Sequence, residues 1–199
     1  MTLTLPDTLS ALTDFAPDLF PPARDLRSSE GTNVQRLSRL GQHWIFSCQV
    51  KAQTYEQALA WAALLEQSAE LMTLKIAQPK LNIGAPGTSV QVDGSGQTGS
   101  VLKLKGLPAG YAAKAGQWLS VVTGGRRYAY RLRANATASG AGLMDAPVNP
   151  MIRAAHLNND VVEVAEPKVT GFVTLRTSAS AININAHVPA IAFVIEEPA

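Results

Sequence analysis

The side chains that most often carry out chemistry are scattered through this sequence. The three histidines, His43, His156 and His187, lie in different segments with no cysteine or carboxylate at metal-ligand spacing. Because metal sites in proteins draw on closely spaced ligands, we expect no metal. No serine lies in a Gly-x-Ser-x-Gly turn, and the glycine-rich stretch 84–99 lacks the Lys-Ser/Thr pair of a phosphate loop. The sequence therefore predicts no catalytic residue, no cofactor and no enzyme.

Three carboxylates leave one alternative open. Asp145, Asp160 and Glu163 are not paired locally, but folding could gather them into a dispersed active site. Such a site would resemble other paired-carboxylate centres only if two of the groups met in one cleft.

The clearest chemical pattern is the run 126–133, which is rich in arginine and tyrosine. On a strand, three of its arginines point one way: Arg127, Arg131 and Arg133. Three of the remaining residues point the other way: Tyr128, Tyr130 and Leu132. Binding of single-stranded nucleic acid needs aromatic and basic groups on one exposed face. We therefore expect the tyrosines in a core and the arginines on a solvent-exposed or intersubunit surface, and no nucleic acid as partner.

Composition excludes several classes of protein. A chain of 199 residues can bury a core in one domain or two small ones. Its formal net charge of +2 gives no electrostatic reason to expect nucleic acid or an acidic membrane as partner. A single cysteine, Cys48, excludes a disulfide framework within the chain. The N-terminus lacks the features of a signal peptide, and no run approaches the roughly 20 apolar residues of a membrane span, so we expect a soluble protein.

One long segment, residues 53–69, has helical periodicity. Its apolar face is expected to consist of Ala58, Trp61, Ala62, Leu65 and Ala69. Thr54 is placed to cap the first turn, and Gln57 follows three residues later as in a capping box. A helix over 54–69 with an aromatic anchor needs a sheet to cover.

The flanking segments offer that sheet. Residues 1–30 contain four prolines and predict an extended arm whose apolar side chains, Phe15, Leu19 and Phe20 among them, cover the core or a neighbouring subunit. Residues 34–40 and 43–50 predict a hairpin around Gly41-Gln42. The second strand has a buried face: Trp44, Phe46, Cys48 and Val50. Further strands are expected at 71–76, 172–175, 181–185 and 191–195.

The middle of the chain reads as a separate all-β segment. A glycine-rich stretch separates it from the helix, and alternating runs at 101–105, 118–122, 126–133 and 161–164 predict a small barrel or sandwich. We therefore expect a β domain with one helix from residues 1–82 and 168–199, and an inserted β-barrel from residues 83–167. The two boundaries should lie close together, and deleting the insert should leave a folded remainder.

Several segments resemble a known family. They are Arg27–Gly31, the strand end Arg39-Leu40-Gly41 followed by His43-Trp44, and the helical sequence Glu56–Leu65. In this order they are similar to the N-terminal domain of distal tail proteins of tailed, siphovirus-like bacteriophages and prophages. The middle segments Gly106–Tyr111, Ala115–Ser120 and Gly125–Tyr128 resemble a β module inserted in some members.

The resemblance implies a mainly β protein: a β-sandwich with one helix, carrying a small OB-like barrel. It implies a hexameric ring, assembled in the host cytoplasm and located at the tail tip of the virion, that joins the tail-tube protein to the tail-tip or hub proteins. We expect Phe15, Leu19 and Phe20 to contribute to the contact between subunits. The alternative is a module that binds carbohydrate on the host surface, for which Tyr111 or Trp118 would have to be exposed. The expected partner or ligand surface of the insert comprises Tyr111, Arg127, Arg131 and Arg133.

Overall fold

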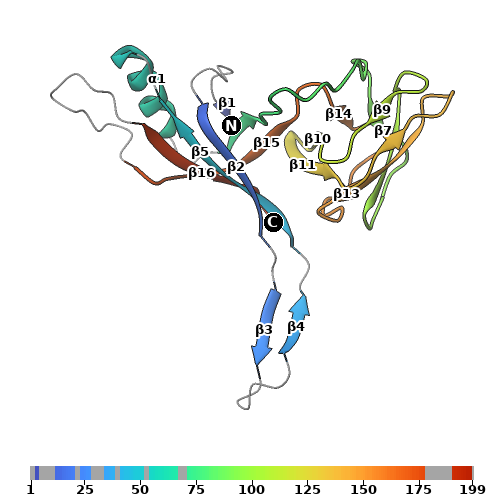
Figure 1. Cartoon of the computed structure of the whole chain (residues 1–199), viewed down its shortest axis with the longest axis horizontal. Helices are drawn as coiled ribbons and strands as arrows, with labels where there is room; N and C mark the ends of the chain where they lie inside the picture. Colours follow the sequence, from blue (N-terminus) through green and yellow to red (C-terminus); the bar gives the residue numbers. More distant parts are fainter. Residues whose placement is uncertain are drawn as a thin grey trace.

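The chain is mainly β, with a twisted sheet and a closed barrel beside it (Figure 1). The structure, a computed structural model, describes residues 3–4, 12–20, 23–27, 34–38, 41–51, 54–66, 71–177 and 190–198. The expected strand at 181–185 and residue His187 lie outside these ranges.

The main sheet has six strands drawn from both parts of the chain that flank the barrel. Their spatial order is β1 (Leu3–Thr4), β6 (Leu71–Lys75), β15 (Lys168–Leu175), β16 (Ile191–Glu196), β5 (His43–Val50) and β2 (Leu12–Phe20). All neighbours are antiparallel except β1 and β6. The C-terminal strand β16 thus lies in the middle of the sheet, between β15 and β5.

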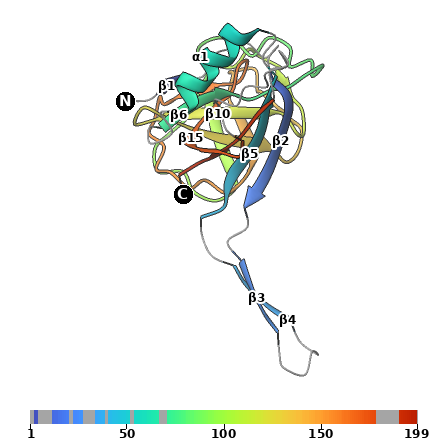
Figure 2. The ribbon, with the colours of Figure 1, turned by 90° about the vertical axis from the view of Figure 1, so that its left-hand side faces the viewer.

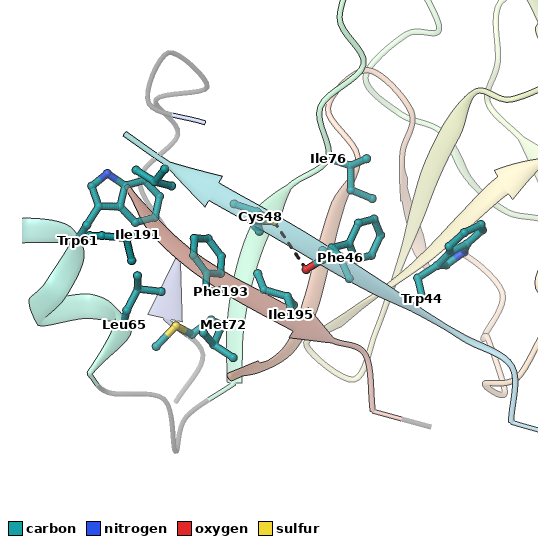
Figure 3. Close-up of a cluster of buried hydrophobic side chains, with 14 of the residues drawn as sticks. Trp44, Phe46, Cys48, Trp61, Leu65, Met72, Ile76, Ile191, Phe193 and Ile195 are labelled. Carbon is teal, nitrogen blue, oxygen red and sulfur yellow. Dashed lines mark hydrogen bonds between the residues drawn. The ribbon is translucent and has the colours of Figure 1, made fainter. Parts of the chain in front are cut away.

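One face of this sheet, called the inner face here, carries most of the first hydrophobic core (Figure 3). The predicted alternation in β5 is confirmed, since all four residues of its apolar face are buried: Trp44, Phe46, Cys48 and Val50. Register places Ile195 beside Phe46 and Phe193 beside Cys48 on the neighbouring strand. Burial raises the pKa of the Cys48 thiol to about 12, which leaves it protonated and unreactive.

The helix α1 (Tyr55–Leu65) covers one end of the inner face. Its N-terminus is capped as predicted, because the Thr54 hydroxyl accepts a hydrogen bond from the Gln57 backbone N–H at 3.3 Å. Four of the five predicted contact residues are buried: Ala58, Trp61, Ala62 and Leu65. The helix ends at Leu65 with Glu66 as its cap, earlier than predicted, and Ala69 lies outside the described residues.

Trp61 fixes the helix to the sheet. Its ring lies 6.1 Å from that of Phe193, and only 3% of the residue is exposed. We expect Trp61→Ala to lower the free energy of unfolding by about 3–5 kcal/mol, because the truncation leaves a cavity under the helix. Leu59→Ala is the matched control, since Leu59 is 49% exposed on the same helix and should change stability by less than about 0.5 kcal/mol. Equal midpoints for both variants in urea denaturation would contradict this packing.

The predicted hairpin between 34–40 and 43–50 is wrong. Strand β4 (Val34–Ser38) pairs with β3 (Ala23–Arg27), and β5 pairs with β2 and β16. Strands β2 and β3 run antiparallel to β4 and β5, so the chain forms one long ribbon whose far end, β3 and β4, projects from the sheet (Figures 1 and 2). The prolines concealed β2: Pro17 is tolerated there because β2 lies at the sheet edge.

The predicted barrel is confirmed. Six strands close in the order β10 (Trp118–Thr123), β11 (Arg126–Leu132), β13 (Met144–Asn149), β8 (Val101–Lys105), β7 (Gln91–Val92) and β14 (Val161–Glu163). A short pair, β9 (Ala112–Ala113) and β12 (Ala136–Thr137), lies outside the closed ring of strands. Strand β13 was not predicted because Pro147 lies inside it. The barrel has its own core, which includes Leu102, Val121 and Tyr130.

The two connections between sheet and barrel lie side by side. The chain leaves the sheet after β6 and returns at β15, where Lys168 is the register partner of Lys75. The Ile76 N–H donates to the Pro167 carbonyl at 2.8 Å, which fastens one connection to the other. The sheet is thus built from residues 3–75 and 168–196, and the barrel from residues 91–163.

The two parts nevertheless share a core. The ring centre of the barrel residue Trp118 lies 4.6 Å from that of Trp44, in an edge-on arrangement, and 5.6 Å from that of Phe46. Both partners lie on the inner face of the sheet. Ala129 of the barrel belongs to the same cluster. The inner face is therefore covered by α1 at one end and by the barrel at the other. This packing argues against our expectation that the remainder folds without the insert.

Candidate functional site: the sheet–barrel joint and the surfaces beside it

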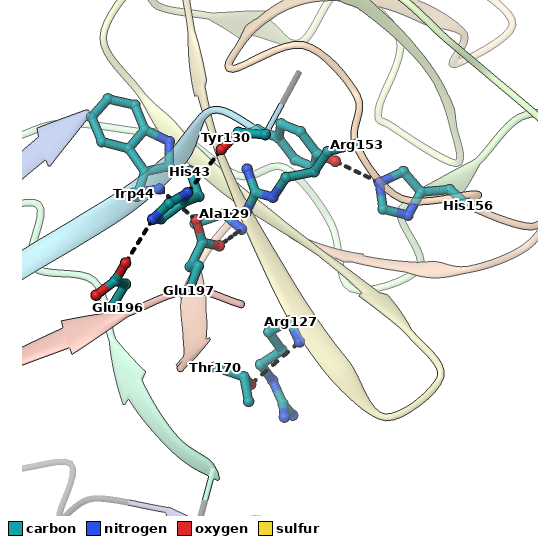
Figure 4. A network of polar contacts seen from close by, with 11 residues as sticks. His43, Trp44, Arg127, Ala129, Tyr130, Arg153, His156, Thr170, Glu196 and Glu197 are labelled. Carbon is teal, nitrogen blue, oxygen red and sulfur yellow. Dashed lines mark hydrogen bonds and ion pairs between the residues drawn. The ribbon is translucent and has the colours of Figure 1, made fainter. Parts of the chain in front are cut away.

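A buried carboxylate joins the sheet to the barrel (Figure 4). Glu197, which follows β16, is 2% exposed. Its Oε2 accepts the Trp44 N–H of the sheet at 2.9 Å, and its Oε1 accepts the Ala129 N–H of the barrel at 2.8 Å. Arg153 Nη2 lies 2.6 Å from Oε2. Burial raises the pKa of Glu197, and the Arg153 charge and the backbone donors oppose that rise.

Arg153 is held by aromatic rings as well as by Glu197. Its guanidinium lies 5.7 Å from the ring centre of Tyr128 and 5.6 Å from that of Tyr130, which are distances for cation–π contact. The Arg153 side chain is 9% exposed. Its buried Nε and Nη1 have no hydrogen-bond partner among the described residues, so the rings and Glu197 provide the compensation for its burial.

From Tyr130 a chain of hydrogen bonds runs through the barrel interior. The Tyr130 hydroxyl lies 2.8 Å from His156 Nε2, and His156 Nδ1 lies 2.7 Å from Thr123 Oγ1. Thr123 donates in turn to Asp160 Oδ2 at 2.5 Å. Because Thr123 donates to Asp160, it accepts from Nδ1–H, which leaves Nε2 to accept from Tyr130. Every member is satisfied with His156 neutral, so the chain stabilises this interior.

Burial of His156 makes stability depend on pH. Desolvation lowers the pKa of this fully buried imidazole from 6.5 to about 4. Below the ordinary histidine pKa the unfolded chain takes up a proton that the folded protein refuses, so stability falls as the pH drops from about 6.5 to about 4. The lost free energy of unfolding should be about 3 kcal/mol.

The comparison that isolates His156 is urea denaturation of the wild type and His156→Gln at several pH values. Glu197 acts in the opposite direction, because a carboxyl whose pKa is raised by folding stabilises the folded state on acidification. Subtracting the free energy of unfolding of His156→Gln from that of the wild type cancels the Glu197 contribution, which both proteins share. This difference in free energy should shrink by about 3 kcal/mol between a pH of about 7 and a pH of about 4. A difference independent of pH would contradict this, because it would show that folding leaves the pKa of His156 unchanged.

The arginines and tyrosines of the run 126–133 lie only partly as the sequence predicted, because Arg127 is half-buried beside Glu163. Tyr130 is fully buried and Tyr128 half-buried, whereas Arg131 and Arg133 are exposed. Arg127 Nε donates to Glu163 Oε1 at 3.1 Å, and its backbone N–H donates to Thr170 Oγ1 of the sheet at 3.3 Å.

The two exposed arginines also have partners in the barrel. The Arg131 guanidinium lies over the Trp118 ring, 5.6 Å from its centre, and Arg133 Nη2 donates to Ser100 Oγ at 3.2 Å. None of the three arginines of this face shares an exposed surface with the tyrosines. The arrangement offers no stacking platform for bases.

Tyr111 and Trp118 do not form an exposed aromatic surface. Tyr111 is 7% exposed, its hydroxyl donates to the Ile83 carbonyl at 2.9 Å, and it accepts from Gln117 Nε2 at 2.9 Å. Trp118 is 5% exposed and lies in the shared core. The placement of Tyr111 on a ligand surface is therefore corrected: its ring packs in the barrel core. The carbohydrate alternative loses both of its expected contact residues.

The three predicted subunit-contact residues separate on β2. Phe15 and Leu19 are half-buried against the core of their own chain, with the Phe15 ring 5.4 Å from Phe46. Phe20 is 46% exposed on the opposite, outer face, where it lies 5.1 Å from His43. Of the three, only Phe20 is therefore exposed enough to contact another molecule.

His43 anchors the base of the projecting ribbon beside Phe20. Its Nε2 lies 2.9 Å from Glu196 Oε1 and its Nδ1 lies 2.8 Å from the Gly41 carbonyl, so both ring nitrogens face acceptor oxygens. The contacts tie the first residue of β5 to β16 across the outer face. These contacts therefore hold the end of the ribbon that adjoins the sheet.

Sequence reasoning missed the ion pair of Glu197 and Arg153, and it missed a pocket. The pocket has a cavity volume of about 430 Å³ and lies between β2 and the two connections that lead to the barrel. Neither feature has a local signal, because each joins segments far apart in sequence. Among the described residues, no group of three or more His, Cys, Asp or Glu is arranged to hold a metal ion. No helix in the described part of the chain has the length and apolar character needed to cross a membrane.

Comparison with known proteins adds no identification. No family model matches the sequence, and no curated protein matches it significantly.

Proposed function

We propose that the chain is a structural distal tail protein of a tailed phage or prophage, forming a ring that joins the tail tube to the tail-tip or hub proteins. The observation that carries the proposal is the ribbon formed by β3 and β4, which projects from the sheet (Figure 2). An isolated two-stranded ribbon is at best marginally stable in water, so a neighbouring molecule that packs against it would stabilise it. This requirement fits a protein that works within an assembly.

The outer face of the sheet supports the same proposal. Phe20 and Phe172 are 46% and 49% exposed there, and Ser47 and Gln49 on strand β5 are exposed on the same face. In a cyclic assembly one contact repeats head to tail until the ring closes, which would cover both this face and the ribbon. The six-fold symmetry, the β-sandwich character of the ring domain and the OB-like character of the barrel come from the resemblance and belong to the proposal.

The test is electron microscopy of the purified protein in negative stain, alone and mixed with the tail-tube and hub proteins. We expect closed rings in at least one of these samples. A variant in which residues 22–41 are replaced by a short Gly-Ser turn should lose the rings and keep the cooperative unfolding of the sheet. Leu59→Ala should form rings like the wild type. A protein that stays monomeric in every mixture would contradict the adapter function.

A further inference from the structure

The pocket beside β2 has both apolar and polar lining residues. Its apolar lining is mostly aliphatic or aromatic: Leu12, Phe15, Ile76, Leu81 and Ile83. Its polar lining includes Thr13, Asp14 and an ion pair in which Lys75 Nζ lies 2.8 Å from Glu166 Oε1. A volume of about 430 Å³ lies within the range of sites that take small ligands or the side chains of a bound peptide.

The walls of the pocket are fixed before anything binds. Gln78 Oε1 accepts a hydrogen bond from the Trp118 backbone N–H of the barrel at 2.8 Å. This bond holds the connection between β6 and β7 against the barrel. The Ile83 carbonyl accepts a hydrogen bond from the Tyr111 hydroxyl at 2.9 Å, near the middle of the same connection. A pocket held in this way costs little ordering when a ligand enters.

The pocket borders a sheet edge, since four of its lining residues, 12–15, belong to β2. Among the described residues β2 pairs with β5 alone, so the other side of its nine-residue backbone is unpaired. Residues directly opposite in an antiparallel pair share a face. Register therefore places Phe15 and Leu19 on the inner face with Cys48 and Trp44, next to the pocket.

The other face of β2 is acidic. Asp14 and Asp18 are opposite Gln49 and Ile45 on the outer face, and both are exposed. Residues 12–20 contain no lysine or arginine. A bulge between Leu12 and Asp14 and the lack of an N–H at Pro17 limit strand addition to a short segment.

We propose that the β2 edge binds an extended segment of another protein, which adds to the sheet as a short further strand. Because side chains alternate along a strand, an apolar side chain would enter the pocket while the residues before and after it lie on the outer face. Lysine or arginine at those positions would face Asp14 and Asp18. The partner is thus a segment with an apolar anchor flanked by basic residues. Binding of such a segment does not depend on formation of the proposed ring.

The experiment uses the full chain and fluorescence anisotropy. The probe is a labelled peptide with the nine-residue length of β2 in which leucine or valine alternates with lysine or threonine. A control peptide of the same composition has its apolar residues in one block. We expect saturable binding of the alternating peptide, weaker binding of the block peptide, and weakening with added salt.

Protein variants separate the two parts of the site. Leu81→Asp puts a charge at the half-buried pocket wall and should abolish binding. Asp14→Lys with Asp18→Lys should weaken it by about tenfold and should strengthen binding of a peptide whose lysines are replaced by glutamate. Asp145→Lys, the same type of substitution at one exposed position of the barrel, is the control and should have no effect.

Three results would overturn the proposal. The first is no saturable binding at millimolar peptide. The second is equal binding of the alternating and block peptides, or indifference to both sets of substitutions. The third is self-association of the wild type that the two aspartate substitutions abolish, since it would make a second copy of this chain the occupant. Circular dichroism and unfolding curves of each variant establish that lost binding is not lost folding.

Discussion

A chain that lacks residues 83–167, with the ends joined by a short Gly-Ser linker, should fail to fold. The deletion removes Trp118 and Ala129 from the first core and uncovers Trp44 and Phe46, which are 4% and 0% exposed in the intact protein. It also leaves the Glu197 carboxylate without Arg153 and the Ala129 N–H. The loss of one buried aromatic residue alone costs about 3–5 kcal/mol, a large part of the stability of a typical domain.

The measurement is circular dichroism with heat and urea denaturation. We expect the shortened chain to aggregate or to unfold without a cooperative transition. The full chain with Trp118→Ala is the graded control: it should fold but lose about 3–5 kcal/mol. Residues 83–167 alone should retain β structure, because the second core draws only on residues between Val90 and Val164. A shortened chain that unfolds cooperatively near the wild-type midpoint would show that the two cores are separable.

Local patterns in the sequence predicted the helices and strands that bury one face along their whole length. The period of two in β5 and β16 and the period of three to four in α1 each reflect burial of one face, so they were visible without the structure. Proline disrupts the same signal. It concealed β2 through Pro17 and β13 through Pro147, although both residues lie in strands.

Pairing was harder to predict than the elements themselves. The strand at Val34–Ser38 was recognised, but it was assigned to the nearest strand in sequence instead of to β3. A local pattern says which face is buried and not which strand lies beside it. Tyr111 illustrates the same limit for the candidate surface. Its type suited a ligand site, and its burial depends on Ile83 and Gln117, which no local pattern connects.

Glu197 was invisible for a related reason. A Glu-Glu pair near the C-terminal end of the sequence reads as solvent-exposed, and for Glu196 this holds, since its side chain is 56% exposed. The next residue along the chain turns inward and meets an arginine from the loop after β13. The charge is tolerated inside because three donors from two parts of the molecule converge on it.

Glu197→Ala should therefore be the most destabilising single substitution at the joint. Removing one member of a buried ion pair leaves the other charge uncompensated, at about 3–5 kcal/mol. The Trp44 and Ala129 N–H groups also lose their acceptor, and each buried donor left unsatisfied costs about 1–3 kcal/mol more. Glu197→Gln keeps an acceptor oxygen and should cost less. The comparison separates the charge from the hydrogen bonds.

Two further variants decide whether the ion pair is responsible. Glu166→Gln removes an exposed partner of Lys75 and should change the free energy of unfolding by less than about 1 kcal/mol. Adding Arg153→Met to Glu197→Ala should recover part of the lost stability, because the uncompensated charge disappears with it and a buried pair replaced by apolar groups is often neutral. The measurement is urea denaturation of the wild type, these four variants and Arg153→Met alone, six proteins under one set of conditions. If the double variant is as unstable as the sum of the two single substitutions, Glu197 acts through its backbone hydrogen bonds and the Arg153 charge is stabilised by Tyr128 and Tyr130 alone.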